Sequence, residues 1–239
     1  MISDMAKRPA WFYNEYQQIG TDFEDPAQVA TYYRNQTSST TESEQALVAQ
    51  LNIRPGHTVI DFGCGAGTFA IQAALAGGRV EAVDISQTML TNAQKQAVAA
   101  GVQTQIQFHQ AGFLTYEHKA APVDVIVTKL ALHHLPDFWK LAALLRMTAM
   151  LKQGGSLYLQ DVIYSFNPVE YRPHIQAWIE QAVVTDDAGW ARRDFETHVR
   201  EEYSTFSWIL EGMLQRAGFK IIEAEPVSSV WAVYLCQKV

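Results

Sequence analysis

The sequence predicts a doubly wound α/β fold, in which helices cover both faces of a mostly parallel sheet. Two observations support this prediction. Apolar segments of strand length alternate with helical segments from residue 54 to residue 162, a pattern typical of parallel strands joined by crossover helices. The first apolar segment also leads directly into a glycine-rich turn at residues 63–67. Such a turn lets the backbone approach a ligand and points helix N–H groups toward it.

Residues 1–53 contain no strand signal and are expected to form a helical cap. Asp25-Pro26 provides an N-cap followed by proline at the first helical position. Thr41–Glu44 indicates a capping box ahead of a second helix. A turn at Arg54-Pro55-Gly56 then leads into the first strand.

Residues 54–162 are expected to form the core, with five strands and three helices in alternation. The predicted strands are Val59–Asp61, Val80–Val83, Gln105–His109, Val123–Val127 and Ser156–Val162. The predicted helices are Thr68–Ala76, a helix capped by Ser86 that runs to about Ala100, and a helix from Pro136 to Leu151 that is closed by a turn at Lys152–Gly155.

Residues 163–217 interrupt this alternation and are expected to form a helical insertion and the final helix. Asn167-Pro168 opens one helix, which runs through Trp178, and a longer helical stretch covers about residues 194–217. Residues 218–239 are predicted to form a closing β-hairpin, so the last strand should be antiparallel. We expect one domain over residues 1–239, as suits a chain of this length.

Composition and charge limit the classes of partner. Hydrophobic residues make up 48% of the chain, which supports a sizeable core, and the net charge of −7 with no basic run argues against a nucleic-acid partner. No apolar run approaches the ~18 residues of a membrane span, and the N-terminus lacks a signal-peptide pattern. Cys64 and Cys236 lie far apart in sequence, which favours free thiols and a cytoplasmic location. The oligomeric state is left open.

The glycine spacing distinguishes between two classes of cofactor. A dinucleotide fingerprint has the form G-x-G-x-x-G, but here the third glycine is Gly67 and the dinucleotide position holds Thr68. Asp61, just before the loop, would repel a pyrophosphate and suits a ligand that carries an ammonium group. An acid followed by Gly63, Gly65 and Gly67 resembles motif I of the class I S-adenosylmethionine-dependent methyltransferases. The alternatives are a turn that binds nothing and a nicotinamide-dependent oxidoreductase.

The resemblance covers about residues 54–162 and the C-terminal hairpin, and it implies a seven-stranded sheet of order 3-2-1-4-5-7-6. It also implies S-adenosylmethionine as cofactor and S-adenosylhomocysteine as product. Asp84 ends the second strand, where an acid can accept the ribose hydroxyls of either an adenosine methyl donor or NAD. The remaining expected contacts are the backbone of Cys64, Ile85 and Met89 around adenine, Gly112 and Phe113 after the third strand, and Lys129 toward the cofactor carboxylate.

Gly112 departs from the family pattern, because the family usually places an acid there for the adenine amino group. Adenine contact is therefore expected from backbone groups and the Phe113 ring. This departure keeps open a third alternative, a non-catalytic S-adenosylmethionine-binding protein.

His133 and His134 follow the fourth strand and are the candidate catalytic residues. Either could act as a general base toward an acceptor hydroxyl, since histidine titrates near neutral pH. The other interpretations are a structural histidine bonded to the backbone and a metal site shared with Asp137. Adjacent histidines in an extended strand point to opposite sides, so no metal site is predicted.

Aromatic residues concentrate outside the core, with 19 of 27 lying beyond residues 54–160. They are expected to pack the cap and to line the site of a small, partly apolar or aromatic acceptor. Methyl transfer from a sulfonium is an in-line displacement that depends mainly on alignment in a dry pocket. The candidate rings are those of Tyr13, Tyr16, Tyr33, Tyr164, Trp178 and Trp208.

Overall fold

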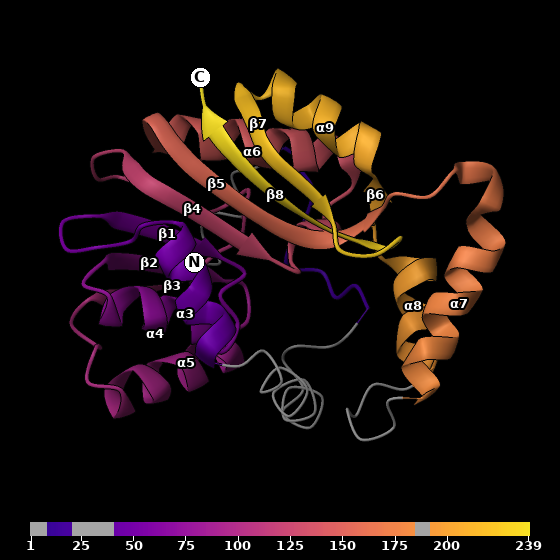
Figure 1. Cartoon of the computed structure of the whole chain (residues 1–239). Coiled ribbons are helices and arrows are strands. Elements are labelled where there is room, and N and C mark those ends of the chain that lie inside the picture. Colours follow the sequence, from indigo (N-terminus) through magenta and orange to yellow (C-terminus); the bar gives the residue numbers. More distant parts are fainter. Residues whose placement is uncertain (1–8, 21–40, 185–191) are drawn as a thin grey trace.

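An eight-stranded sheet forms the centre of the computed structural model, which describes residues 9–20, 41–184 and 192–239 (Figure 1). Seven strands follow the order β3-β2-β1-β4-β5-β8-β7, and a short strand, β6, pairs with β5. The strands are β1 Thr58–Phe62, β2 Arg79–Asp84, β3 Ile106–Gln110, β4 Val123–Lys129, β5 Leu151–Tyr164, β6 Thr205–Phe206, β7 Phe219–Pro226 and β8 Trp231–Lys238.

The first five strands are parallel, and β8 runs antiparallel to both of its neighbours, β5 and β7. The predicted fold class and strand order are therefore confirmed, with β7 and β8 as the two strands of the closing hairpin. Parallel strands covered on both faces are apolar throughout, and accordingly Val59 and Ile60 in β1 have no exposed surface.

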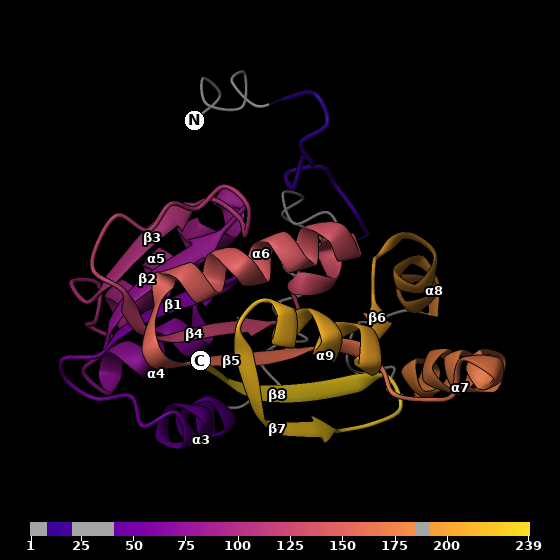
Figure 2. The same cartoon turned by 90° about the horizontal axis from the view of Figure 1, so that it is seen from above.

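Helices cover both faces of the sheet (Figure 2). On one face, α3, α4 and α5 pack on β1 and β2 through a cluster that includes Leu47, Ala70 and Leu90. On the other face, α6 and α9 pack through Leu144 and Leu214. The helices are α3 Thr41–Gln50, α4 Thr68–Leu75, α5 Gln87–Ala99, α6 Asp137–Met150, α7 Tyr171–Val184, α8 Arg192–Glu201 and α9 Ser207–Arg216, with 3-10 helices η1 Leu132–His134 and η2 Pro168–Glu170.

Among the described helices, none is both long and apolar enough to cross a membrane. Helices α7 and α8 lie side by side at one end of the sheet (Figure 1). They belong to the predicted insertion, and their position brings α8 close to the loop that follows β4.

The prediction of one continuous helix over residues 194–217 is wrong, because the helix is interrupted in its middle. Helix α8 ends at Glu201, Thr205–Phe206 pairs with the end of β5 as β6, and α9 begins at Ser207. The break has a physical reason: the Thr205 hydroxyl donates a 3.1 Å hydrogen bond to Asp137, and the Phe206 ring packs against Tyr164. These tertiary contacts stabilise two extended residues that local pattern assigns to a helix.

Two other boundaries differ from the prediction. Strand β5 begins at Leu151 rather than Ser156, because Leu151 pairs with Val123 ahead of a bulge in the β4–β5 register. The expected turn at residues 152–155 lies within this strand. Residues 9–20 form turns rather than a helix, and the helix expected after Asp25-Pro26 lies outside the described residues.

Candidate functional site

The glycine loop connects β1 to α4 at the carboxyl edge of the sheet. Its start is fixed by two backbone hydrogen bonds, from the N–H groups of Gly63 and Cys64 to the carbonyl of Val83 in β2 (2.8 and 3.1 Å). All three glycines have positive φ, from 50° to 76°, a region that side chains disfavour. The loop therefore needs glycine for its backbone at each position.

The three glycines differ in what surrounds them. A Cβ on Gly63 would collide with Ala131, and one on Gly67 would lie 2.9 Å from the Cβ of Ala93 in α5. At Gly65 no described atom lies within 4 Å of the Cβ position. Gly63 and Gly67 thus permit close packing within the protein, whereas Gly65 borders open space in which a ligand can approach the backbone.

Asp84 holds this loop against the end of β2. One of its carboxylate oxygens accepts a 2.8 Å hydrogen bond from the Gly65 N–H, and the other accepts a 2.9 Å hydrogen bond from the Ser86 N–H. Ser86 in turn caps α5 by accepting from the Met89 N–H at 3.1 Å, as the sequence predicted. Asp84 is half-buried beside Gly65.

Asp61 is a buried carboxylate, 4% exposed, at the end of β1. No described donor reaches its Oδ2 atom. Burial raises the pKa of Asp61 to about 7; the charge of Lys129 opposes this rise, and Glu44 and Asp84 add to it. Lys129 forms an ion pair with Glu44 of α3, so its ammonium group is already engaged by a carboxylate.

The expected adenine contacts are divided between the surface and the core. Ile85 is half-buried after β2, and Met89 is buried in α5. Phe113 turns inward, where its ring stacks on Phe62 with centroids 5.3 Å apart and belongs to the main core cluster. The expectation that the Phe113 ring contacts adenine is therefore replaced by a packing role, because this large ring is only 8% exposed.

Gly112 lies against the carboxylate of Glu15, and a Cβ at this position would collide with that carboxylate. Glu15 is buried and accepts a 2.9 Å hydrogen bond from the Leu114 N–H. The N-terminal segment thus supplies an acidic group beside the loop where Gly112 lacks one. Sequence reasoning missed Glu15, since no local pattern links it to a loop so distant in the chain.

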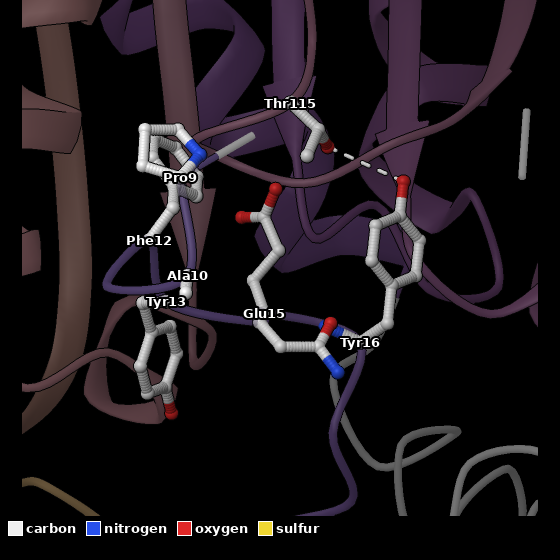
Figure 3. Close-up of a pocket in the computed structure, with 8 residues that line it drawn as sticks. Pro9, Ala10, Phe12, Tyr13, Glu15, Tyr16 and Thr115 are labelled. Atoms are coloured by element: carbon white, nitrogen blue, oxygen red, sulfur yellow. Dashed lines mark hydrogen bonds between the residues drawn. The ribbon is translucent and has the colours of Figure 1, made fainter. Parts of the chain in front are cut away.

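A small pocket next to this contact is lined by Pro9, Ala10, residues 12–16 and Thr115 (Figure 3). The Tyr16 hydroxyl forms a 3.3 Å hydrogen bond with Thr115, and the Tyr13 hydroxyl donates a 3.2 Å hydrogen bond to the carbonyl of His134. The N-terminal segment therefore bridges the loops that follow β3 and β4. Tyr13 and Tyr16, two of the four tyrosines selected from the sequence, thus lie at this edge of the sheet.

His133 and His134 lie in the 3-10 helix η1, with ring centroids 4.3 Å apart. The expectation that an extended strand would point them to opposite sides is wrong, because the helical turn brings the rings together. His133 is buried and contacts Asp161 of β5 through Nδ1, and its backbone N–H donates to the same carboxylate at 3.0 Å. Its Nε2 lies 3.1 Å from the carboxylate of Glu202.

These contacts shift the pKa values of the two histidines in opposite directions. Burial lowers the pKa of His133, but Asp161 and Glu202 outweigh burial and raise it to about 10. Burial and the neighbouring charge of His133 lower the pKa of His134 to about 3. His133 is therefore protonated near pH 7, and His134 is neutral but weakly basic.

Comparison with known proteins identifies the core. The family described as a methyltransferase domain matches residues 59–155, a segment that runs from β1 through the glycine loop and Asp84 into β5. Residues 59–155 are therefore similar to the methyltransferase domain of class I methyltransferases. Enzymes of this class use S-adenosylmethionine as cofactor.

Three similar proteins are methyltransferases of small molecules. A 27-O-demethylrifamycin SV methyltransferase of Amycolatopsis mediterranei is 32% identical, over 54% of this chain and 47% of its own length. A ubiquinone/menaquinone biosynthesis C-methyltransferase of Cupriavidus pinatubonensis is 28% identical, over 60% of each chain. The chain thus spans about half to three fifths of these two relatives.

The third similar protein is a solved structure, magnesium protoporphyrin IX methyltransferase of Synechocystis with bound S-adenosylmethionine. It aligns with a TM-score of 0.67 over 97% of this chain and all of that chain, at 16% identity. At this level of identity the similarity supports the shared fold.

Two features of this chain fit S-adenosylmethionine. The open space at Gly65 leaves room for a ligand against the backbone. The buried oxygen of Asp61 that receives no hydrogen bond from a described donor suits an ammonium group, which the methionine part of the cofactor carries.

The other aromatic residues that the sequence assigned to the acceptor site differ in their surroundings. Tyr164 and Trp178 pack in a cluster with Phe166, and Trp178 also contacts His198 edge-on at 5.2 Å. Trp208 is 63% exposed on α9. Tyr33 lies outside the described residues. Tyr16 thus contacts the loop after β3, Tyr13 contacts the loop after β4, and Trp178 contacts His198.

Proposed function

We propose that this chain catalyses methyl transfer from S-adenosylmethionine to a small, partly apolar or aromatic acceptor. The observation that supports this proposal best is the combination of an open backbone position at Gly65 with two carboxylates: Asp84, which is bonded to the Gly65 N–H, and buried Asp61 at the end of β1. The acidic net charge and the aromatic cap favour a small molecule over a polyanionic acceptor.

Each of these groups has a role that follows from its chemistry. Asp61 would bind the ammonium group of the cofactor, and Asp84 would accept hydrogen bonds from the ribose hydroxyls while it holds the loop. The cofactor supplies an activated sulfonium methyl group. The protein would align the acceptor for in-line attack and keep water out.

In this proposal neither His133 nor His134 acts as an efficient general base. Both ring nitrogens of His133 contact carboxylates, those of Asp161 and Glu202, so neither is placed to take a proton from an acceptor. His134 is neutral, but a base with a pKa of about 3 removes a hydroxyl proton poorly. We therefore propose that alignment, rather than general base catalysis, accounts for most of the rate.

A cytoplasmic setting is part of the proposal, because Cys64 and Cys236 are both free thiols, as is usual in a reducing compartment. Neither cysteine is assigned a chemical role. Both are buried, and burial raises the pKa of each thiol, so the reactive thiolate is disfavoured.

Calorimetric titration with S-adenosylmethionine, S-adenosylhomocysteine and NAD tests the cofactor. We expect the first two to bind and NAD not to bind. Asp84→Ala should weaken binding at least about tenfold, since each charge-assisted hydrogen bond contributes about 1.5–3 kcal/mol. Binding of NAD alone, or an unchanged affinity in a folded Asp84→Ala protein, would contradict the proposal.

Methyl transfer is then measured with radiolabelled cofactor on a panel of phenols, quinols and other apolar small molecules, with RNA and DNA in parallel. We expect transfer to members of the small-molecule panel. Transfer only to nucleic acid, weakening steeply with salt, would show that the assignment of the acceptor is wrong.

A further inference from the structure

Three side chains from two segments far apart in the sequence converge at one end of the sheet. They are His133 in η1, His198 in α8 and Glu202 directly after α8. One nitrogen of each imidazole and a carboxylate oxygen all lie within 4.8 Å of one another. His198 and Glu202 are four residues apart, which places them on one helix face, but the sequence does not link them to His133, whose contact with them depends on the position of α8.

One nitrogen of each imidazole, called its inner nitrogen here, contacts the same carboxylate oxygen of Glu202. Nε2 of His133 lies 3.1 Å from Oε2 of Glu202, and Nδ1 of His198 contacts the same oxygen. In this form of the protein, protons between these atoms hold the three groups together. A cation placed among two imidazole nitrogens and a carboxylate would satisfy the same atoms.

The second nitrogen of each imidazole, its outer nitrogen, contacts a different side chain. Nδ1 of His133 contacts the buried carboxylate of Asp161, and Nε2 of His198 forms a 2.7 Å hydrogen bond with the Ser204 hydroxyl. Histidines that bind metals characteristically use their second nitrogen in this way, and such partners fix both the ring orientation and the ligating tautomer. An ion-pair cluster alone does not require both outer nitrogens to be anchored.

The scaffold around the cluster is rigidly connected. The His133 backbone N–H donates to Asp161 at 3.0 Å, and its carbonyl accepts from the Tyr203 N–H at 2.9 Å. The Trp178 ring meets His198 edge-on with centroids 5.2 Å apart. His133 is 6% exposed, so water competes little for the inner face. The ligand atoms are thus held in place without a metal.

We propose that His133, His198 and Glu202 form a binding site for a divalent first-row transition-metal ion, with Zn²⁺ as the preferred ion. Two imidazoles and one carboxylate are a ligand set typical of zinc, and three protein ligands leave a coordination position open. Magnesium and calcium prefer ligand sets made of oxygen atoms. The proposal is independent of methyl transfer, since a chain without that activity can still bind the ion.

The test uses the full chain, stripped of metal with a chelator, dialysed, and titrated with ZnCl₂ at pH 8 by calorimetry. We expect one zinc per chain. His198→Ala and the nearly isosteric Glu202→Gln should each raise Kd at least about tenfold, and Asp161→Asn should raise it by about tenfold through loss of the outer hydrogen bond. His118→Ala, which removes a histidine outside the cluster, serves as the matched control and should bind as wild type.

Substitution with Co²⁺ gives a second readout, because its visible absorption reports nitrogen and oxygen ligands directly. Circular dichroism shows that each variant is folded; if His198→Ala is not, Glu202→Gln carries the comparison. The proposal is overturned if the wild-type chain takes up no zinc. It is equally overturned if Glu202→Gln binds zinc and perturbs the Co²⁺ spectrum no more than His118→Ala does.

Discussion

If Asp61 binds the ammonium group of the cofactor, as proposed, cofactor binding is sensitive to pH. Burial raises the pKa of this carboxyl to about 7, against the opposing charge of Lys129. The ionised form binds an ammonium group, so affinity should be retained above pH 7 and lost as the pH falls through 7. We expect Kd for S-adenosylmethionine to rise about tenfold from pH 8 to pH 6, as a single proton with this pKa requires.

Calorimetry at several pH values checks this expectation. Asp61→Asn, which cannot ionise, is the control and should bind weakly with little dependence on pH. A wild-type Kd that stays constant between pH 6 and pH 8 would show that Asp61 does not bind the cofactor's charge.

Two glycines of the loop should respond differently to the same substitution. Alanine at either Gly65 or Gly67 adds left-handed backbone strain of about 1–2 kcal/mol. Gly67→Ala also forces a Cβ against Ala93, so it should lower the melting temperature more. Gly65→Ala should weaken cofactor binding more, because its Cβ enters the open space. Melting curves and Kd values for both variants check this; equal effects on both quantities would contradict the separate roles.

At the scale of single elements, the short strand β6 anchors the start of α9. The buried Thr205 hydroxyl donates to Asp137 of α6, and Phe206 packs on Tyr164. We expect Thr205→Val to lower the free energy of unfolding by about 0.5–1.5 kcal/mol, the usual net value of a hydrogen bond. Urea denaturation measures it, with the exposed Thr104→Val as control. A loss no greater than in the control would mean that this bond does not stabilise β6.

The elements differ in how far the sequence predicts them. The alternation of apolar and helical segments was sufficient for β1 to β4, and the capping role of Ser86 was predicted from its position. Strand β6 was not predictable, because two residues are too short to show a period of two. Residues 9–20 were expected to be helical, but their structure depends on contacts with the loops after β3 and β4.

The residues of the candidate site also differ in how far the sequence predicts their position. Gly63, Gly65, Gly67 and Asp84 lie within one strand–helix–strand unit, so local spacing predicted their position. Glu15, Asp161, His198 and Glu202 reach the site from distant segments, and their partners are determined by how α8 and the N-terminal segment fold back. Pairings of this kind require the tertiary structure.

At the scale of the whole molecule, the N-terminal segment bridges two loops at the edge of the sheet that holds the cofactor site. Glu15 binds the Leu114 N–H, and Tyr13 binds the His134 carbonyl. Cofactor and acceptor should order this bridge further, so amide hydrogen exchange in residues 11–20 should slow when both bind. Exchange measured with and without S-adenosylhomocysteine and an accepted substrate checks this. Unchanged rates would show that the bridge is not part of the site.

The position of β8 between β5 and β7 has a consequence for how this chain is made. Until Trp231–Lys238 leaves the ribosome, one edge of β5 remains open, and its buried residues Leu157 and Leu159 have a strand only on the β4 side. Open apolar edges recruit other chains. A nascent polypeptide that stalls after β5 therefore exposes a surface prone to aggregation, and the interval before β8 is synthesised is when a chaperone would be of most use to this protein.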